Sequence, residues 1–424
     1  MNRGLVEDYI LEYTKRPIPP LIERDLRIAQ TDRIISIIGP RRAGKTYYFY
    51  QLMRDKKEKA LYLNFEDTRL IELNFKEIRD LIRIYKEFRG KEPEYLFLDE
   101  IQNIQNWELA IREILDTQRY KIFITGSSSK LLSYEIATSL RGRTFKYLLL
   151  PFSFSEFLKA EGSPLGEALS KEEKAEIRGK LRRYLEFGGF PELVKEKEKE
   201  RILKGFYELI LFRDLVERHK LKNIALARFL LSNFSQNLSC EMSINKIFNF
   251  LKSQGKRVGK NTLYDYCEKI EDSVSVFFLL RYSEKIYQKE AWPKKVYLCD
   301  TGLSKVVRAQ EDIGKLMENA VFLELLRRQN ERPLIELYYY KDTSGKEIDF
   351  VLKEKTKVEE LIQVCYNIEE IKTKEREFKS LITGAKRLNC QNLTVITWDL
   401  EAEEEFKGFW VNLIPLTKWL IDKG

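Results

Sequence analysis

Ile34-Ile-Ser-Ile-Ile-Gly-Pro-Arg-Arg-Ala-Gly-Lys-Thr46 is the stretch that decides how this chain folds. Its first five residues are typical of a buried strand, and Gly39 to Thr46 follow the phosphate-loop pattern G-x-x-x-x-G-K-S/T. Gly39 and Gly44 let backbone N–H groups wrap closely around a polyanion, because glycine has no Cβ and tolerates positive φ. The stretch therefore predicts a strand, a phosphate-binding loop and a helix in succession.

The side chains of this loop suit a nucleoside triphosphate and its magnesium ion. Lys45 supplies a cation for the β- and γ-phosphates, and the hydroxyl of Thr46 is a ligand for Mg²⁺. The helix that begins at Tyr47 directs the positive end of its dipole at the same phosphates. We expect ATP and Mg²⁺ as cofactors, and the residues expected to bind them are Gly39, Pro40, Arg41, Arg42, Ala43, Gly44, Lys45, Thr46 and Tyr47.

A second apolar segment, residues 95–98, ends in the two carboxylates Asp99 and Glu100. Asp99 is expected to hold Mg²⁺ through water, next to Thr46. Glu100 is expected to orient and deprotonate the attacking water. With Lys45, Glu100 is therefore our candidate for catalysis of hydrolysis.

Strands and helices alternate along residues 34–150, which predicts an α/β fold with a parallel sheet covered by helices. Right-handed crossovers place the carboxyl ends of all these strands at one edge, where a ligand binds. The phosphate loop, Asp99-Glu100 and Thr125-Gly-Ser-Ser128 all follow such strands. We expect them to form one site.

Two further candidates each have two interpretations. Ser127 either contacts the γ-phosphate or the attacking water, or it caps a helix over residues 129–134. Arg141 or Arg143 either acts as an arginine finger on the nucleotide of a neighbouring subunit, or belongs to a structural pair of arginines. The finger interpretation predicts a homo-oligomer, for example a hexamer.

Composition narrows the classes of function. The chain has 424 residues and a net charge of +9, which permits nucleic-acid binding without establishing it. The five cysteines are far apart and His219 is the single histidine, so a zinc site is not expected, and a Ser-His-Asp triad would need His219. Because no apolar run approaches ~18 residues, we expect no membrane span and a cytoplasmic protein with reduced cysteines.

The second half of the chain changes in pattern. Ser170-Lys-Glu-Glu173 predicts the start of a helix that runs to Phe187, within a helical lid over residues 151–237. Residues 238–305 predict two helices joined by a turn and followed by a hairpin, which resembles a winged helix. The second helix would either enter a DNA major groove or pack against protein. The second alternative stays open because the helix carries several acidic residues beside Lys260 and Lys269.

Several segments together resemble the prokaryotic AAA-type (AAA+) ATPases that carry a C-terminal nuclease-like domain. They are Gly39 to Thr46, Asn64-Phe-Glu-Asp67, Leu98-Asp-Glu-Ile-Gln-Asn103, Thr125-Gly-Ser-Ser-Ser-Lys-Leu-Leu132, Ser139-Leu-Arg-Gly-Arg143 and Pro151-Phe-Ser-Phe154. The resemblance covers about residues 20–400 and implies an AAA+ core, which we place over 31–150. Residues 1–30, broken by Pro17, Pro19 and Pro20, are expected to form an N-terminal arm before it. It further implies a winged helix and, over 306–424, a domain of the PD-(D/E)xK nuclease fold.

An active nuclease of that fold uses a helix Glu, an Asp and a Glu-x-Lys pair to hold Mg²⁺ and activate water. Glu318 and Asp349 match the first two positions, whereas Gln363 and Cys365 stand where Glu and Lys are needed. This nuclease-like remnant of Glu318, Asp349 and Gln363 lacks one ligand charge and the lysine. We expect cleavage to be lost and the fold to be kept for DNA binding or assembly.

Three classes of function remain open. The first is an ATP-hydrolysing oligomer that acts on or senses DNA. The second is an ATP-regulated, metal-dependent DNA nuclease. The third is a nucleotide-gated switch or scaffold for protein partners with slow hydrolysis.

Overall fold

The computed structural model describes residues 2–70, 73–117, 119–127, 140, 142–163, 170–308, 310 and 312–422. The chain divides into two compact units, Met1–Leu149 and Leu150–Gly424. The finer division at residues 30, 150, 237 and 305 stays a prediction. No helix in the described ranges is long and apolar enough to cross a membrane.

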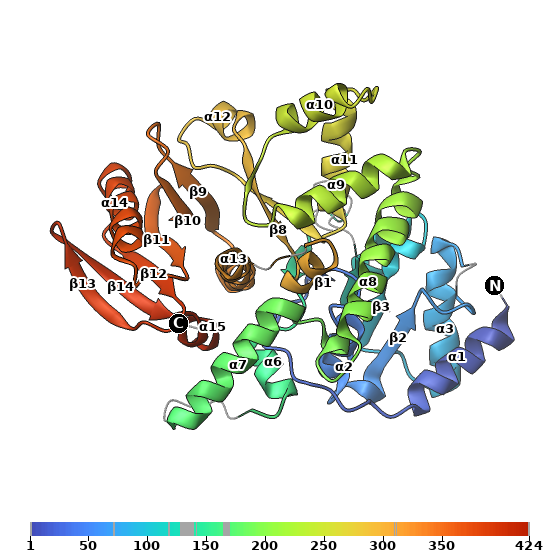
Figure 1. Cartoon of the computed structure of the whole chain (residues 1–424). Helices are drawn as coiled ribbons and strands as arrows, with labels where there is room; N and C mark the ends of the chain where they lie inside the picture. The colour runs from blue at the N-terminus through green and yellow to red at the C-terminus, as the bar shows by residue number, and fades with distance from the viewer. Residues whose placement is uncertain are drawn as a thin grey trace. The chain divides into compact units, whose positions relative to one another are not determined.

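The first unit is built on a parallel sheet with the strand order β2-β3-β4-β1-β5 (Figure 1). Because β4 lies between β1 and β3, the strand that leads into the phosphate loop is separated from the strand of Asp99 by one neighbour. The strands are β1 (Ile34–Ile38), β2 (Ala60–Asn64), β3 (Tyr95–Asp99), β4 (Lys121–Gly126) and β5 (Thr144–Leu148).

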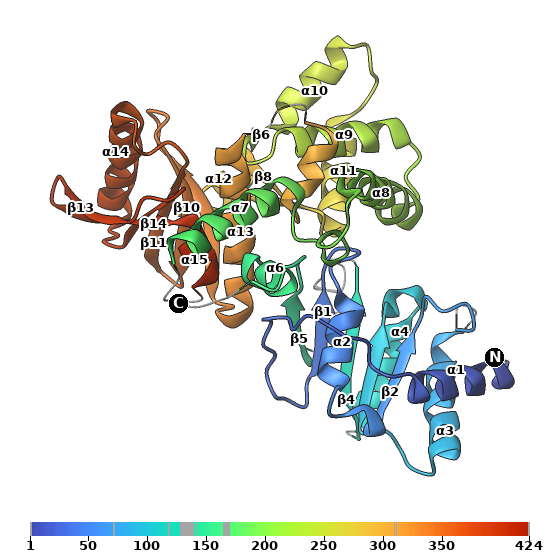
Figure 2. The same ribbon diagram turned by 60° about the horizontal axis from the view of Figure 1, so that its bottom comes forward.

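Helix α2 covers one face of this sheet, as Figure 2 shows with α2 in front of β1. Its Tyr48 and Phe49 join Ile35, Ile37 and Phe97 in one buried cluster, so apolar burial fixes the helix behind the phosphate loop. The predicted N-terminal arm opens with a helix, α1, that contacts α3 and β2. The helices are α1 (Arg3–Lys15), α2 (Lys45–Met53), α3 (Ile78–Arg89) and α4 (Trp107–Asp116), with 3₁₀ segments at Lys57–Lys59, Phe75–Glu77 and Ile101–Asn103.

The second unit begins with helices. Ser170 and Glu173 form the expected capping box, in which each side chain accepts the other's backbone N–H, and Gly188 with φ 78° ends the helix that follows. The helical elements are α6 (Phe154–Ala160), α7 (Lys171–Phe187), α8 (Lys199–Leu209), a π-helical stretch (Ile210–Glu217) and α9 (Ile224–Gln236), with a 3₁₀ turn at Pro191–Leu193.

The next segment combines two helices with a small antiparallel sheet of order β6-β8-β7. Helix α10 contacts α11, and α11 contacts β7, so the helices lie against the sheet. The elements are β6 (Glu241–Met242), α10 (Ile244–Ser253), α11 (Lys260–Asp272), β7 (Val276–Leu279), α12 (Ile286–Ala291), β8 (Lys294–Leu298) and a 3₁₀ segment (Thr301–Val306).

The last part holds a mixed sheet of order β13-β14-β12-β11-β10-β9. Helix α14 packs on β10 and β11 (Figure 1), and it lies close to β10 at Gly384, where a Cβ would come 2.2 Å from the Cδ1 end of the Ile348 side chain. Strands β9, β10 and β11 are antiparallel, whereas β11, β12 and β14 run parallel. The elements are α13 (Ile313–Glu331), β9 (Ile335–Lys341), β10 (Glu347–Glu354), β11 (Lys357–Cys365), α14 (Ile371–Leu388), β12 (Leu393–Thr397), β13 (Ala402–Phe406), β14 (Phe409–Pro415) and α15 (Leu416–Ile421).

Candidate functional site

The phosphate loop runs from the end of β1 to the start of α2 and needs glycine at both ends. A Cβ at Gly39 would lie 1.9 Å from the carbonyl oxygen of Leu149, so this position excludes every other residue on steric grounds. Gly44 adopts φ 92° as the N-cap of α2, a left-handed conformation that favours glycine. The loop therefore presents backbone, and not side chains, at the start of the helix.

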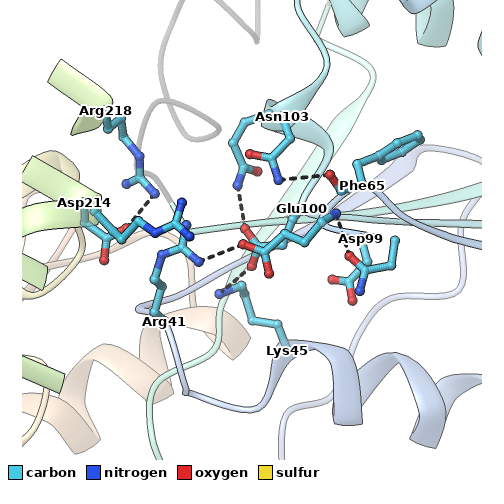
Figure 3. Close-up of polar contacts among 12 residues, drawn as sticks. Arg41, Lys45, Phe65, Asp99, Glu100, Asn103, Asp214 and Arg218 are labelled. Atoms are coloured by element: carbon cyan, nitrogen blue, oxygen red, sulfur yellow. Dashed lines mark hydrogen bonds and ion pairs between the residues drawn. The ribbon is translucent and has the colours of Figure 1, made fainter. Parts of the chain in front are cut away.

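Lys45 is buried and lies between this loop and the carboxylate of Glu100. Its Nζ donates to the carbonyl oxygens of Gly39 and Pro40 at 3.1 and 3.2 Å. The same Nζ lies 3.2 Å from Oε1 of Glu100 (Figure 3). The cation expected to bind phosphate is therefore paired with a buried carboxylate of the same site.

Asp99 is fully buried at the end of β3 and accepts three hydroxyl donors. Thr46 and Tyr62 donate to its Oδ2 at 2.7 and 2.8 Å, and Thr125 donates to Oδ1. Burial and the neighbouring charge of Glu100 raise the pKa of Asp99, and the three hydroxyls partly offset this rise. Asp99, at the end of β3, is thus oriented toward Thr46 in the first turn of α2, although β4 separates β3 from the strand that leads into that helix.

Glu100 follows Asp99 in a left-handed backbone conformation with φ 51°, which is uncommon for a residue with a Cβ. Its backbone N–H donates to Oγ1 of Thr125 at 2.9 Å, and its carboxylate accepts from Gln102. Burial alone would raise the pKa of Glu100, but the Lys45 cation, with Gln102 and Arg41, outweighs burial and lowers it. The carboxylate is therefore charged and aimed at the phosphate loop.

These residues fit a nucleoside triphosphate with Mg²⁺. The loop is a backbone cradle with no room for a side chain at Gly39, and α2 begins directly behind it. The hydroxyl of Thr46 and the carboxylate of Asp99 meet at 2.7 Å, and both are oxygen ligands of the kind that Mg²⁺ prefers.

The remaining predicted residues of the loop differ in exposure. Pro40 and Ala43 are buried, whereas Arg42 and Tyr47 are exposed. Arg41 pairs with Glu66 at 2.7 Å, on the loop after β2.

The two candidates beyond the loop lie at opposite ends of the parallel strands, one at the carboxyl ends and one at the amino ends. Ser127 is fully buried directly after β4, whose Gly126 carbonyl accepts the N–H of Gly39 at 3.4 Å. Arg143 lies at the amino ends, because it precedes β5 and its carbonyl accepts the N–H of Ile34 at the start of β1. Its Nη1 is 2.9 Å from Oδ1 of Asp116. Arg141 and the helix expected over residues 129–134 lie outside the described residues.

Sequence reasoning did not assign roles to Thr125, Tyr62 or Arg24. Thr125 lies on β4 between the two functional strands and binds both Asp99 and the backbone of Glu100. Arg24, in the predicted arm, donates to the carbonyl of Ala43 at 2.7 Å and so supports the phosphate loop. The stretch Thr125-Gly-Ser-Ser128 was expected to reach the nucleotide site, but its residues carry three hydroxyl groups. Only the structure shows that the hydroxyl of Thr125 is the one that binds Asp99.

A second group of charges lies in the C-terminal part and corrects one expectation. We expected no lysine beside Glu318 and Asp349, but Lys295 of β8 lies between them. Its Nζ is 2.9 Å from Oε1 of Glu318 and 2.9 Å from Oδ1 of Asp349. The expectation was wrong because it considered only the residues on β11, whereas the lysine comes from a different sheet.

Gln363 is buried and donates to Oε2 of Glu377 on α14 at 2.8 Å. It therefore binds a carboxylate instead of supplying one beside Glu318 and Asp349. Within the described ranges, no group of three or more His, Cys, Asp or Glu side chains is arranged to hold a metal ion. With Lys295 between Glu318 and Asp349 and with Gln363 bound to Glu377, these residues as arranged do not fit a metal ion.

Two proteins of known sequence are similar to this chain over most of its length. The sequence is 38% identical over 413 residues to the uncharacterized protein MJ1544 of Methanocaldococcus jannaschii, covering 94% of this chain and 91% of that protein. This chain belongs to the MJ1544 family. An uncharacterized protein of Haemophilus influenzae is also similar to this chain. It is 28% identical over 386 residues, which cover 86% of this chain and 92% of that protein.

Three family models match successive parts of this MJ1544-family chain. Residues 31–158 match an AAA domain, which agrees with the parallel sheet and the phosphate loop. Residues 178–312 and 313–419 match two domains of unknown function, DUF8612 and DUF4143. Among solved structures, the Walker-type ATPase PABY2304 of Pyrococcus abyssi is similar at 14% identity and a TM-score of 0.40, over 72% of this chain and 95% of that one.

Proposed function

We propose that this chain binds ATP with Mg²⁺ and hydrolyses it, with Glu100 as the general base. The observation that supports this most is the network at one sheet edge, in which Lys45 meets Glu100 and Thr46 meets Asp99. Mg²⁺, when bound with the nucleotide, would supply charge neutralisation at the phosphates, with Thr46 and Asp99 as its protein partners. ATP turnover by a Glu100→Gln variant that still binds ATP tests the proposal.

Lys45 links binding to catalysis in this proposal. When its ammonium turns to the phosphates, Glu100 loses its main counterion while it remains buried. Because burial raises the pKa of a carboxyl group, Glu100 then becomes a stronger base for the attacking water. Ser127, directly after β4, is the proposed contact to that water or to the γ-phosphate.

We further propose that Arg143 acts on the nucleotide of a neighbouring copy. The position of Arg143 at the sheet edge opposite its own phosphate loop supports this, because it cannot reach the nucleotide of its own chain. The side chain is 41% exposed and is held by Asp116. The proposal implies a homo-oligomer, for example a hexamer, whose turnover depends on protein concentration.

A groove on the C-terminal part supports nucleic-acid binding as a second function. The groove has a volume of about 480 Å³ and lies along α14. No carboxylate is among its lining residues in the described part of the chain, so it favours a polyanion such as a DNA backbone. Its five cations are Lys346, Lys379, Lys386, Arg387 and Lys407.

The segment with α10 and α11 is proposed to be a winged helix that packs against protein. Two lysines on α11 are already engaged, since Lys269 pairs with Asp265 at 2.7 Å and Lys260 lies over the ring of Phe248. The same helix carries Asp265, Glu268, Glu271 and Asp272, and this negative charge makes it poorly suited to a phosphate backbone. We therefore assign DNA contact to the groove on α14, and propose a PD-(D/E)xK-like domain there that binds without cleaving.

A further inference from the structure

Lys295 lies at the centre of three carboxylates that come from two elements of the C-terminal part. Its Nζ is 2.9 Å from Glu318 on α13, 2.9 Å from Asp349 on β10 and 2.7 Å from Glu347 on β10. The lysine itself comes from β8 and is only 2% exposed. The three protons of one ammonium group thus match three carboxylate oxygens.

Other donors bind the same three carboxylates, and one of them shares the Glu318 oxygen that Lys295 contacts. The hydroxyl of Tyr297 donates to Oε1 of Glu318 at 2.7 Å, and the backbone N–H of Val364 donates to Oδ2 of Asp349 at 2.9 Å. Lys341 lies 3.1 Å from Oε2 of Glu347. A metal ion at this place would have to displace a buried cation and compete with these hydrogen bonds.

The charge of Lys295 is stable in this position. Burial alone would lower the pKa of Lys295, but the carboxylates of Asp349, Glu318 and Glu347 outweigh burial and raise its pKa well above the ordinary value. These carboxylates thus favour the charged form of the ammonium.

We propose that the ammonium of Lys295 is an internal counterion that takes the position of a divalent metal ion, so that the carboxylate cluster folds without metal. The C-terminal part then keeps its two matching nuclease carboxylates and cleaves no DNA with Mg²⁺ or Mn²⁺. The same contact joins β8, from the small sheet, to β10 and α13. Lys295 thus has a structural role across two modules that the family models separate at residue 312.

Replacing the ammonium of Lys295 by a Mn²⁺ ion tests this proposal. The measurements use the full-length chain without added nucleotide. Lys295→Met keeps an unbranched side chain one atom shorter and removes the charge, which leaves the three carboxylates without this counterion. We expect the melting temperature to fall by roughly 10 °C, and Mn²⁺ to restore much of this loss. Mn²⁺ binding, counted by electron paramagnetic resonance, should rise by one ion per chain, and this ion should disappear in Lys295→Met/Asp349→Asn.

Two controls isolate the cluster. Lys341→Met removes a lysine that pairs with Glu241 and Glu347 but does not lie between Glu318 and Asp349, so Mn²⁺ should give no rescue. As a single change in the wild type, Asp349→Asn should leave Mn²⁺ binding unchanged, because any ion near Asp99 and Thr46 is unaffected.

Three results would overturn the proposal. Wild-type binding of Mn²⁺ that depends on Asp349 would show that Lys295 shares the site with a metal. A Lys295→Met chain that gains no Asp349-dependent ion, or that fails to fold even with Mn²⁺ present, would show that the two cations are not interchangeable. None of these results bears on ATP hydrolysis, which has its own site and its own variants.

Discussion

The Nζ of Lys45 lies 3.2 Å from Oε1 of Glu100, and both groups are buried. The proposed phosphate-binding cation and the proposed general base therefore neutralise each other in this structure. In the proposed mechanism, nucleotide binding separates this pair and leaves Glu100 as a stronger base. The first prediction follows from this exchange of partners.

Glu100→Gln should abolish turnover while ATP affinity stays the same or becomes tighter. The amide cannot accept the proton of the attacking water, and it no longer holds Lys45 away from the phosphates. We expect turnover to fall by about 10²-fold or more, the usual contribution of a general base. Steady-state phosphate release, together with ATP binding by calorimetry, measures both effects.

Lys45→Ala is the contrasting variant, since it should lose ATP binding altogether. If Glu100→Gln hydrolyses ATP at the native rate, the assignment of Glu100 as the base is wrong.

Thr125→Val should reduce both stability and turnover, although the two side chains have nearly the same shape. The hydroxyl donates to Asp99 and accepts the N–H of Glu100, so valine leaves two buried polar groups without this partner. We expect a loss of about 1–3 kcal/mol in the free energy of unfolding, from urea denaturation. Thr125→Ser keeps the hydroxyl and should retain most of the turnover, and equal loss in both variants would contradict this role.

Arg143→Ala should keep ATP affinity and lose turnover at every protein concentration. The wild type should hydrolyse ATP with a specific activity that rises with concentration, because the arginine comes from a neighbouring copy. Asp116→Asn is the matched control, since it removes the partner of Arg143 within the chain and leaves the arginine in place. A strictly monomeric wild type with constant specific activity would rule out the proposed finger.

Charge reversal in the groove should weaken DNA binding and its dependence on salt. In Lys379→Glu/Lys386→Glu/Lys407→Glu, the slope of log K against log salt should become shallower by about three, roughly one for each lysine that no longer neutralises a phosphate. Lys372→Glu, on the same helix but outside the groove, should leave the slope almost unchanged. Fluorescence anisotropy at several salt concentrations measures the slope, and equal slopes in both variants would move the binding surface elsewhere.

The raised pKa of Asp300 should make the free energy of unfolding depend on pH. It is buried and accepts the backbone N–H groups of Gly189 and Gly302 at 2.7 and 2.9 Å. Burial raises its pKa to about 7, although these two hydrogen bonds oppose the rise. Because the folded pKa is the higher one, its stabilising effect is present below about pH 4 and is lost as the pH rises toward 7.

The loss should reach about 4 kcal/mol in the free energy of unfolding across this window. Urea denaturation of the wild type and of Asp300→Asn at several pH values isolates the contribution, since asparagine does not ionise. A constant difference between the two proteins from about pH 4 to pH 7 would contradict the raised pKa.

Local patterns in the sequence predicted much of the nucleotide site. The strand before Gly39, the strand before Asp99 and the capping box at Ser170 are each complete within a few residues, and the structure confirms each element. Burial periodicity and capping act over one or two turns, so they can be read from a single segment.

The residues that the sequence did not reveal depend on contacts between distant segments. Thr125 acquires its role only because β4 lies between β1 and β3, an order that no local pattern encodes. Lys295 is 54 residues from Asp349 and belongs to another sheet. Its part in the carboxylate cluster follows from packing between modules, which motif spacing along β11 does not predict.

Gly39 also links the phosphate loop to the last residue of the first unit. The backbone of this glycine touches the carbonyl of Leu149, and Leu149 is the residue at which the first unit ends. A Cβ at residue 39 would have to push this carbonyl away, so any other residue there would shift either the loop or the residue that follows β5. The glycine thus allows the phosphate loop and the end of the last strand of this sheet to lie in direct backbone contact.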